Sequence, residues 1–157
     1  MAFDDAPYNP VAIMNAVASH AAETGYFERV NQHEPKNAPG NGLSAAVWVD
    51  RIDPVGAISG LDSTSLRVVF MIRIYSSMLQ EPQDAMDPEM LRAAHAIMTQ
   101  LSSDFGLGGI IKNIDLLGAY GEGLLGRAGY IQVAQQMFRV FTITVPTVVN
   151  DALDQQE

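Results

Sequence analysis

The sequence contains no cysteine, which excludes disulfide bonds, thiolate nucleophiles and thiolate metal ligands. Positive charge is scarce as well, since 9 Lys plus Arg stand against 18 Asp plus Glu and the formal net charge is −9. Such a chain lacks the broad basic surface that binds nucleic acid phosphates. No apolar run approaches the roughly 20 residues of a membrane-spanning helix, and the N-terminus carries Asp4 and Asp5 where a signal peptide is basic. We therefore expect a soluble protein that is made in a cytoplasm and has no membrane contact.

The chain is 157 residues long and 48% hydrophobic, and only 17% of its residues are charged. A domain of this length buries about 68–70% of the surface that its unfolded chain exposes, so it can form its own core. The composition is not that of a disordered chain. We expect a single domain over residues 1–157, with a short N-terminal arm over 1–8 and an acidic C-terminal tail over 151–157 that frays.

Two segments carry the signals of helices. Asn9 can cap a helix that starts with Pro10, because proline lacks the N–H that would be left unpaired there. Apolar residues at helical spacing then predict a helix over residues 10–24. Asp87-Pro88 is a second helix start, and the apolar stripe behind it predicts a helix over 88–104.

The other apolar runs predict strands, over residues 43–49, 66–75, 110–117, 129–133 and 138–145. Pro146 interrupts the last run, so its far end is expected at a sheet edge. The order of helix, strands, helix and strands is typical of an α+β domain. We expect a single, mostly antiparallel β-sheet with two main helices packed on one face.

The run 66–75 alternates at period two, which places its apolar residues on one face of a strand. Arg67, Arg73 and Tyr75 fall on the opposite face. That face is therefore expected to be partly solvated or to meet a partner.

Two glycine-rich stretches invite a nucleotide-binding interpretation. Gly121 to Gly126 matches G-x-G-x-x-G, but a strand-like run follows it where a helix is required, and Glu122 would lie beside a phosphate. Neither this stretch nor Gly106 to Gly109 has the Gly-Lys-Ser/Thr ending of a P-loop. Both are expected to be turns.

Acid–base and metal chemistry also lack a convincing pattern. The three histidines, His20, His33 and His95, show no ligand spacing. Asp50 and Asp53 are close enough in sequence for a carboxylate pair, but Asp53-Pro54 is an ordinary turn start. We expect no enzyme activity, no cofactor and no metal site.

Other residues indicate contact with protein partners. The loop over residues 33–42 is a candidate contact arm or a plain connector into the next strand. Trp48 suits a core or a subunit interface, and two methionines flank the 76–87 loop, where adaptable side chains suit an assembly surface. The candidate subunit or tube interface comprises His33, Lys36, Asn37, Trp48, Arg67, Arg73, Tyr75, Met78 and Met86.

Four stretches together resemble the tail terminator proteins of long-tailed (siphovirus-type) bacteriophages, in the version carried by phages of actinobacteria. They are the capped N-terminal helix, the loop from His33 to Gly40 with the strand Leu43 to Val49, the strand ending Met71 to Tyr75, and Gly129-Tyr130-Ile131 followed by Phe138-Arg139-Val140 and Val145-Pro146. The similarity spans roughly residues 8–150. It rests on the order and spacing of these stretches, because no single motif is diagnostic.

The resemblance implies a tail-terminator-like sheet flanked by helices, and a homo-oligomeric ring, usually a hexamer, in the virion tail. Such a ring ends polymerisation of the tail tube and provides the head-joining surface. The implied partners are the protein itself, the major tail tube protein and head–tail connector proteins, while DNA passes through the lumen without specific binding. Two alternatives remain: another head–tail joining or tail completion protein of related fold, and a small soluble ligand-binding domain.

Overall fold

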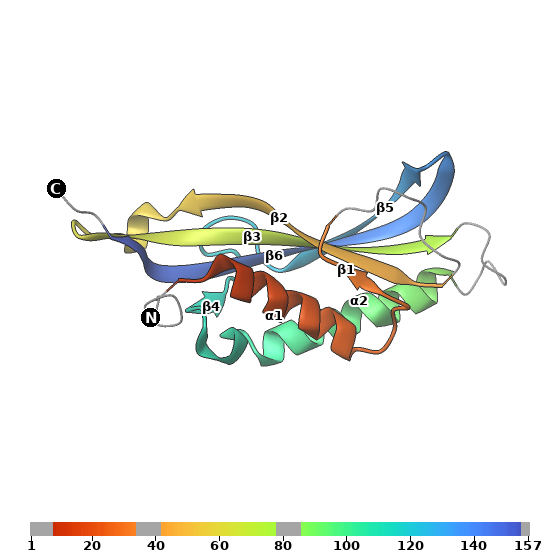
Figure 1. Ribbon diagram of the computed structural model, residues 1–157, viewed down its shortest axis with the longest axis horizontal. Helices are drawn as coiled ribbons and strands as arrows, with labels where there is room; N and C mark the ends of the chain where they lie inside the picture. The colour runs from red at the N-terminus through yellow and green to blue at the C-terminus, as the bar shows by residue number, and fades with distance from the viewer. Residues whose placement is uncertain (1–7, 34–41, 78–85, 155–157) are drawn as a thin grey trace.

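The computed structural model describes residues 8–33, 42–77 and 86–154. Its elements are α1 (Pro10–Glu23), β1 (Val30–Asn31), β2 (Ser44–Pro54), the short 3₁₀ helix η1 (Gly56–Ile58), β3 (Ser63–Ser77), α2 (Met86–Ser103), the 3₁₀ turn η3 (Leu107–Gly109), β4 (Asn113–Ile114), β5 (Leu125–Val133) and β6 (Gln136–Asp154). Figure 1 shows a long twisted sheet with both helices on one side of it. The protein is an α+β fold, as the sequence predicts.

One six-stranded sheet forms the body of the molecule, in the order β1-β2-β3-β6, with β4 and β5 both pairing with β6. β1 runs parallel to β2, and the other pairs are antiparallel. β5 pairs with the first half of β6 and β4 with its second half. The two long central strands, β3 and β6, therefore carry different neighbours at their two ends.

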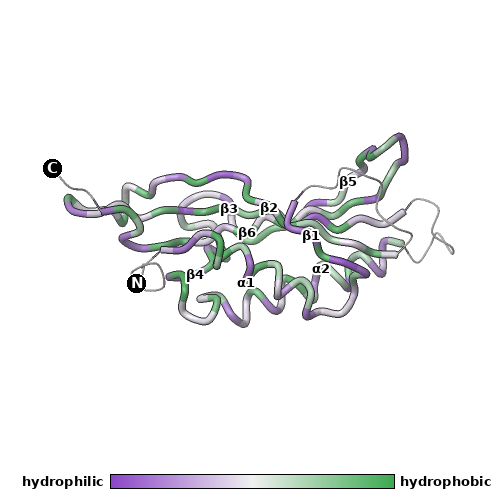
Figure 2. The backbone as a smooth tube through the Cα atoms, in the orientation of Figure 1, coloured by the Kyte–Doolittle hydropathy of each residue, from purple (hydrophilic) through white to green (hydrophobic). Residues whose placement is uncertain are grey.

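The main core lies between the helices and the sheet. β3 contributes every second residue from Leu66 to Ile74, and these side chains are at most 5% exposed. They pack against Ile13 and Val17 of α1 and Ile97 of α2. Figure 2 shows hydrophobic and hydrophilic residues alternating along these elements. The period-two pattern of the sequence thus fixes which face of the sheet receives the helices.

The predicted start of α1 is confirmed, because the backbone N–H of Ala12 donates to Oδ1 of Asn9 at 3.1 Å. Near its other end, His20 lies 2.8 Å from Oε1 of Gln100 and 2.9 Å from Oδ2 of Asp104, and so links the two helices. The Asp104 carboxylate can only accept, so the ring nitrogen facing it donates, whereas the role of the nitrogen facing Gln100 depends on the histidine tautomer. Burial lowers the pKa of His20, but the hydrogen bonds with Gln100 and Asp104, together with the negative charges of Asp104 and Glu23, raise that pKa above its usual value.

The structure corrects the expectation that Pro146 ends a strand at a sheet edge. β6 continues through Pro146 to Asp154 and lies between β3 and β4. The carbonyl of Pro146 accepts a hydrogen bond from the backbone N–H of Asp115. In an antiparallel strand the N–H and the carbonyl of one residue point to the same side, so the N–H that proline lacks would also point away from β3. On that side the pairing with β5 has ended at Thr144, and pairing with β4 begins at Thr147. The proline therefore removes no bond from a ladder.

Other boundaries also differ from the predictions. β2 does not stop at Val49, because Asp53 and Pro54 still pair with β3. The strand expected over 110–117 is only Asn113–Ile114, whereas β5 begins four positions earlier than expected. The tail expected to fray pairs with the start of β3 up to Asp154. Pairing with a long neighbour holds these residues in strands that their own sequence does not predict.

Candidate interaction surface

The sheet face away from the helices, hereafter the outer face, has a small apolar cluster of its own. Tyr75 of β3 and Phe138 of β6 are at most 1% exposed, and their rings meet edge to face at 6.3 Å between centroids. Ala46 and Val140 complete the buried part of this cluster. No helix covers it in the described chain. Tyr75 was expected on a face that is solvated or meets a partner, but its own sheet neighbours already bury it.

Trp48 and Arg73 form the open part of the outer face. They lie on neighbouring strands, and the Arg73 guanidinium sits 5.2 Å from the centroid of the indole ring. Nε of Arg73 donates to Oγ1 of Thr142 on β6 at 2.9 Å, which fixes the guanidinium over the ring. Both side chains are half-buried. We refer to them as the Trp48–Arg73 patch, and it offers a planar cation and an aromatic surface to solvent.

Arg67 shares the outer face with Arg73 but is only 2% exposed, so the expectation of a partly solvated or partner-facing residue is wrong here. Residues 115–124, hereafter the Arg67 loop, cover it. Nε of Arg67 lies 3.6 Å from Oδ2 of Asp115, and the guanidinium also donates to the carbonyl of Glu122. A Cβ on Gly121 would come within 3.0 Å of that guanidinium, so the loop can approach this closely only with glycine there.

Asp115 holds the Arg67 loop together through hydrogen bonds to its backbone. It is 3% exposed, and its two carboxylate oxygens accept from the backbone N–H groups of Ala119 at 2.7 Å and Tyr120 at 3.0 Å. These bonds and Arg67 together satisfy a buried negative charge. The Gly121 to Gly126 stretch is thus a turn that leads into a strand, as predicted.

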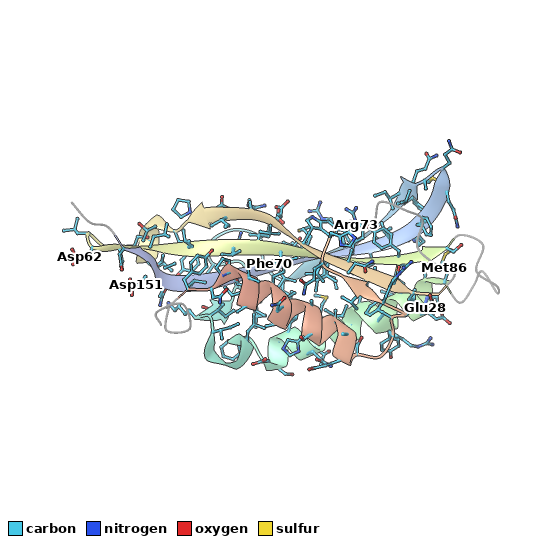
Figure 3. The ribbon with its side chains drawn as sticks, viewed as in Figure 1. Glu28, Asp62, Phe70, Arg73, Met86 and Asp151 are labelled. Carbon is cyan, nitrogen blue, oxygen red and sulfur yellow. The ribbon has the colours of Figure 1, made fainter. Side chains whose placement is uncertain are left out.

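The remaining predicted interface residues do not join the Trp48–Arg73 patch. His33 is exposed just after β1, at the sheet edge formed by β1. Met86 is the first residue of α2, and Figure 3 shows it away from Arg73, on the helix side. Lys36, Asn37 and Met78 lie outside the described residues.

Sequence reasoning missed a second surface cluster, around the β5–β6 hairpin. Arg139 lies 4.5 Å above the ring of Tyr130 and contacts Asp87 in the first turn of α2 at 3.0 Å. The Arg139 guanidinium lowers the pKa of Asp87, and this carboxylate raises the pKa of Arg139. The sequence marked only Asp87 of this cluster, as part of a helix start. The pairing of Tyr130 with Arg139 depends on strand register, which no local pattern predicts.

The candidate chemical groups do not converge on a reactive site. Asp50 and Asp53 both bind Arg51 at 2.8 Å, so they form an exposed ion-pair cluster. Within residues 8–33, 42–77 and 86–154, no group of three or more His, Asp or Glu side chains is placed to hold a metal ion.

Comparison of the sequence with known proteins identifies no family for this chain. No protein-family model matches the chain. No curated protein matches its sequence either. None of the helices in the described part of the chain is long and apolar enough to cross a membrane.

Proposed function

We propose that this chain is a structural protein of a phage tail. Copies of it, six in the usual arrangement, form a ring on the tail tube, end tube polymerisation and present a surface to the head. Its partners are then further copies of itself, the major tail tube protein and the head–tail connector, and its place is the virion tail. DNA passes through the ring without specific binding.

The Trp48–Arg73 patch is the observation that carries this proposal. Aromatic and arginine side chains are the types enriched at protein interfaces, where they supply much of the binding energy. Here they lie half-buried on a sheet face that no described helix covers, already oriented by Thr142. A fixed aromatic and cationic surface suits contact with protein. The α+β architecture is also the one that the resemblance to tail terminators implies.

Electron microscopy of particles from a phage in which this gene is disrupted tests the proposal. Filled heads beside detached tails of irregular, overlong length are expected, because nothing then stops tube growth. Detached tails of normal length would favour a different joining role between head and tail. Intact infectious particles would contradict both roles and call for a ligand search.

Complementation with variants connects this role to the patch. Trp48→Ala is expected to restore few infectious particles and to leave overlong tails, while Val11→Ala restores assembly. Val11 is a suitable control because it is 66% exposed on α1, on the other side of the sheet. Thermal unfolding of both purified variants confirms that they are folded. Full rescue by a folded Trp48→Ala protein would remove the patch from the proposal.

A further inference from the structure

β5 is an open edge of the sheet, and among the described residues it pairs only with β6. None of its residues is buried, its register with β6 is continuous, and it contains no proline. β2 on the opposite side differs, because a bulge between Val49 and Arg51 and a proline at its end interrupt it. Bulges, prolines and charges keep edge strands from pairing with other chains. β5 has only one charged residue, Arg127, and no described strand pairs with its outer edge.

The charged residues that line the two clefts beside β5 are two arginines and two carboxylates, although the chain as a whole carries a net charge of −9. Arg139 is paired with the carboxylate at the start of α2, and Arg127 lines the same small groove as Glu122. The other end of the molecule is acidic, and Figure 3 shows Asp62 and Asp151 there. Two acidic copies repel each other. They therefore meet most favourably where the local charge cancels, which is at β5.

β5 carries a projecting aromatic ring and, two positions earlier, a small side chain beside a cleft. Tyr130 is 60% exposed, and Ala128, two positions earlier on the same face, lines an open cleft of about 80 Å³ with Leu91 and Phe141. In an antiparallel pair of two β5 strands centred on Gly129, Tyr130 of each copy lies directly opposite Ala128 of the other. Each projecting ring then covers the small side chain and the cleft of the other copy.

We propose that a second copy of this chain docks on β5, and that the two β5 strands pair antiparallel about a two-fold axis at Gly129. The sheets of the two copies become continuous, and the same surface serves both partners. The inference uses only the edge, charge and shape of β5, so it stands apart from the proposed role in a tail.

The absence of cysteine makes this register directly testable. Opposite residues in an antiparallel pair lie about 4.5–5.5 Å apart, within the range of about 4.4–6.8 Å that a disulfide spans between Cα atoms. A Cβ on Gly129 meets only Val140, at 3.8 Å, so Gly129→Cys fits the fold. The full-length variant is expected to form a disulfide dimer on mild oxidation. Leu61→Cys, at a 94% exposed position before β3, is expected to stay largely uncrosslinked.

Sedimentation of the unmodified chain and two charge variants gives a second readout. A dimer is expected for the unmodified protein. Ala128→Glu is expected to weaken it about tenfold or more, because the new carboxylate is buried against the partner copy's ring. Ile52→Glu adds the same charge to the edge at β2, where Ile52 is 50% exposed, and is expected to leave the dimer unchanged.

A protein that stays monomeric with no cross-link through Gly129→Cys would overturn this inference. A larger closed ring without that cross-link would also overturn it, while the proposed ring role would stand. A dimer that cross-links at Gly129→Cys and dissociates with Ala128→Glu supports the inference, even where phage assembly does not need the protein. The two proposals therefore fail in distinguishable ways.

Discussion

β3 carries two arginines on the same face of the sheet, and the structure gives them opposite surroundings. Arg67 is buried under its loop and paired with Asp115, whereas Arg73 lies half-buried over Trp48 and faces solvent. The strand is the same and the residue type is the same. What differs is the segment on the far side of β6. Next to Arg67 that strand is β4, and the loop after β4 folds back over Arg67; next to Arg73 it is β5, which stays in the sheet.

This difference separates a structural half of the outer face from an open half. A buried ion pair costs desolvation of both charges, and removal of one partner leaves the other charge buried and uncompensated. An arginine stacked on an aromatic ring near solvent keeps much of its hydration and its capacity to bind. Four predictions test this contrast, from the largest expected effect to the smallest.

Breaking the buried pair is expected to have the largest effect. Asp115→Ala leaves Arg67 charged and unpaired and removes the acceptors of two backbone N–H groups in the Arg67 loop. Loss of one partner of a buried pair costs about 3–5 kcal/mol of unfolding free energy, measurable by urea unfolding. The double variant Arg67→Met/Asp115→Leu is expected to lose less than Asp115→Ala alone. A double variant whose loss equals the sum of the losses in Arg67→Met and Asp115→Leu alone would show that the pair is not coupled.

Two glycines of β5 are expected to respond in opposite ways. A Cβ on Gly126 would overlap the ring of Phe141, whereas a Cβ on Gly129 makes only an ordinary van der Waals contact with Val140. Gly126→Ala is expected to lower the unfolding free energy by about 1–3 kcal/mol, since the ring must move. Gly129→Ala is expected to leave it unchanged or to raise it by about 0.5–1 kcal/mol. A neutral Gly126→Ala would show that the hairpin repacks freely.

Removal of the cation from the open half is expected to be mild. Arg73→Gln loses a cation–π contact worth about 0.5–1 kcal/mol near the surface and changes the surroundings of Trp48. Because Trp48 is the only tryptophan, its fluorescence emission reports the change directly. Arg127→Gln, also on the outer face, is the control and is expected to leave the emission unchanged. A destabilisation as large as that of Asp115→Ala would abolish the contrast between the two halves.

The smallest effect is expected from pH, and it arises on the helix side. The pKa of His20 is raised in the folded state, so its stabilising contribution is fully present below about pH 6.5 and is lost as the pH rises through the raised pKa. The pKa of Asp104 is lowered, first by the N–H of Gly108 and then by His20, so its contribution is lost only as the pH falls below about 3.8. Melting temperatures between pH 6 and 8 are expected to decline slightly, and His20→Gln is expected to remove that decline. A decline that persists in His20→Gln would place the titrating group elsewhere.

The fold class and both helices were predictable because their signals are local. The cap at Asn9, the helix start at Asp87 and the alternation along β3 depend on residues within a few positions of each other. Strand ends were less predictable. Pro146 looks like a strand breaker to any local criterion, and only the gap between β4 and β5 makes it acceptable in the interior of the sheet.

The candidate surface divides in the same way. Trp48 and Arg73 were expected at an interface, and the structure brings them together in an open patch. Arg67 is the same residue type on the same face of β3, so no local pattern separates it from Arg73. The cluster of Tyr130, Arg139 and Asp87 was not predicted, because its members come into contact only through the register of β5 with β6 and the packing of α2.

The sequence by itself determined the fold class, the main helices and which face of β3 receives them, since hydrophobic period and capping act over a few residues. The tertiary structure alone decided which arginine is buried, which strand end stays paired and which edge is open. Those outcomes depend on where the chain returns over the sheet, and no local pattern encodes the neighbour that a distant segment supplies.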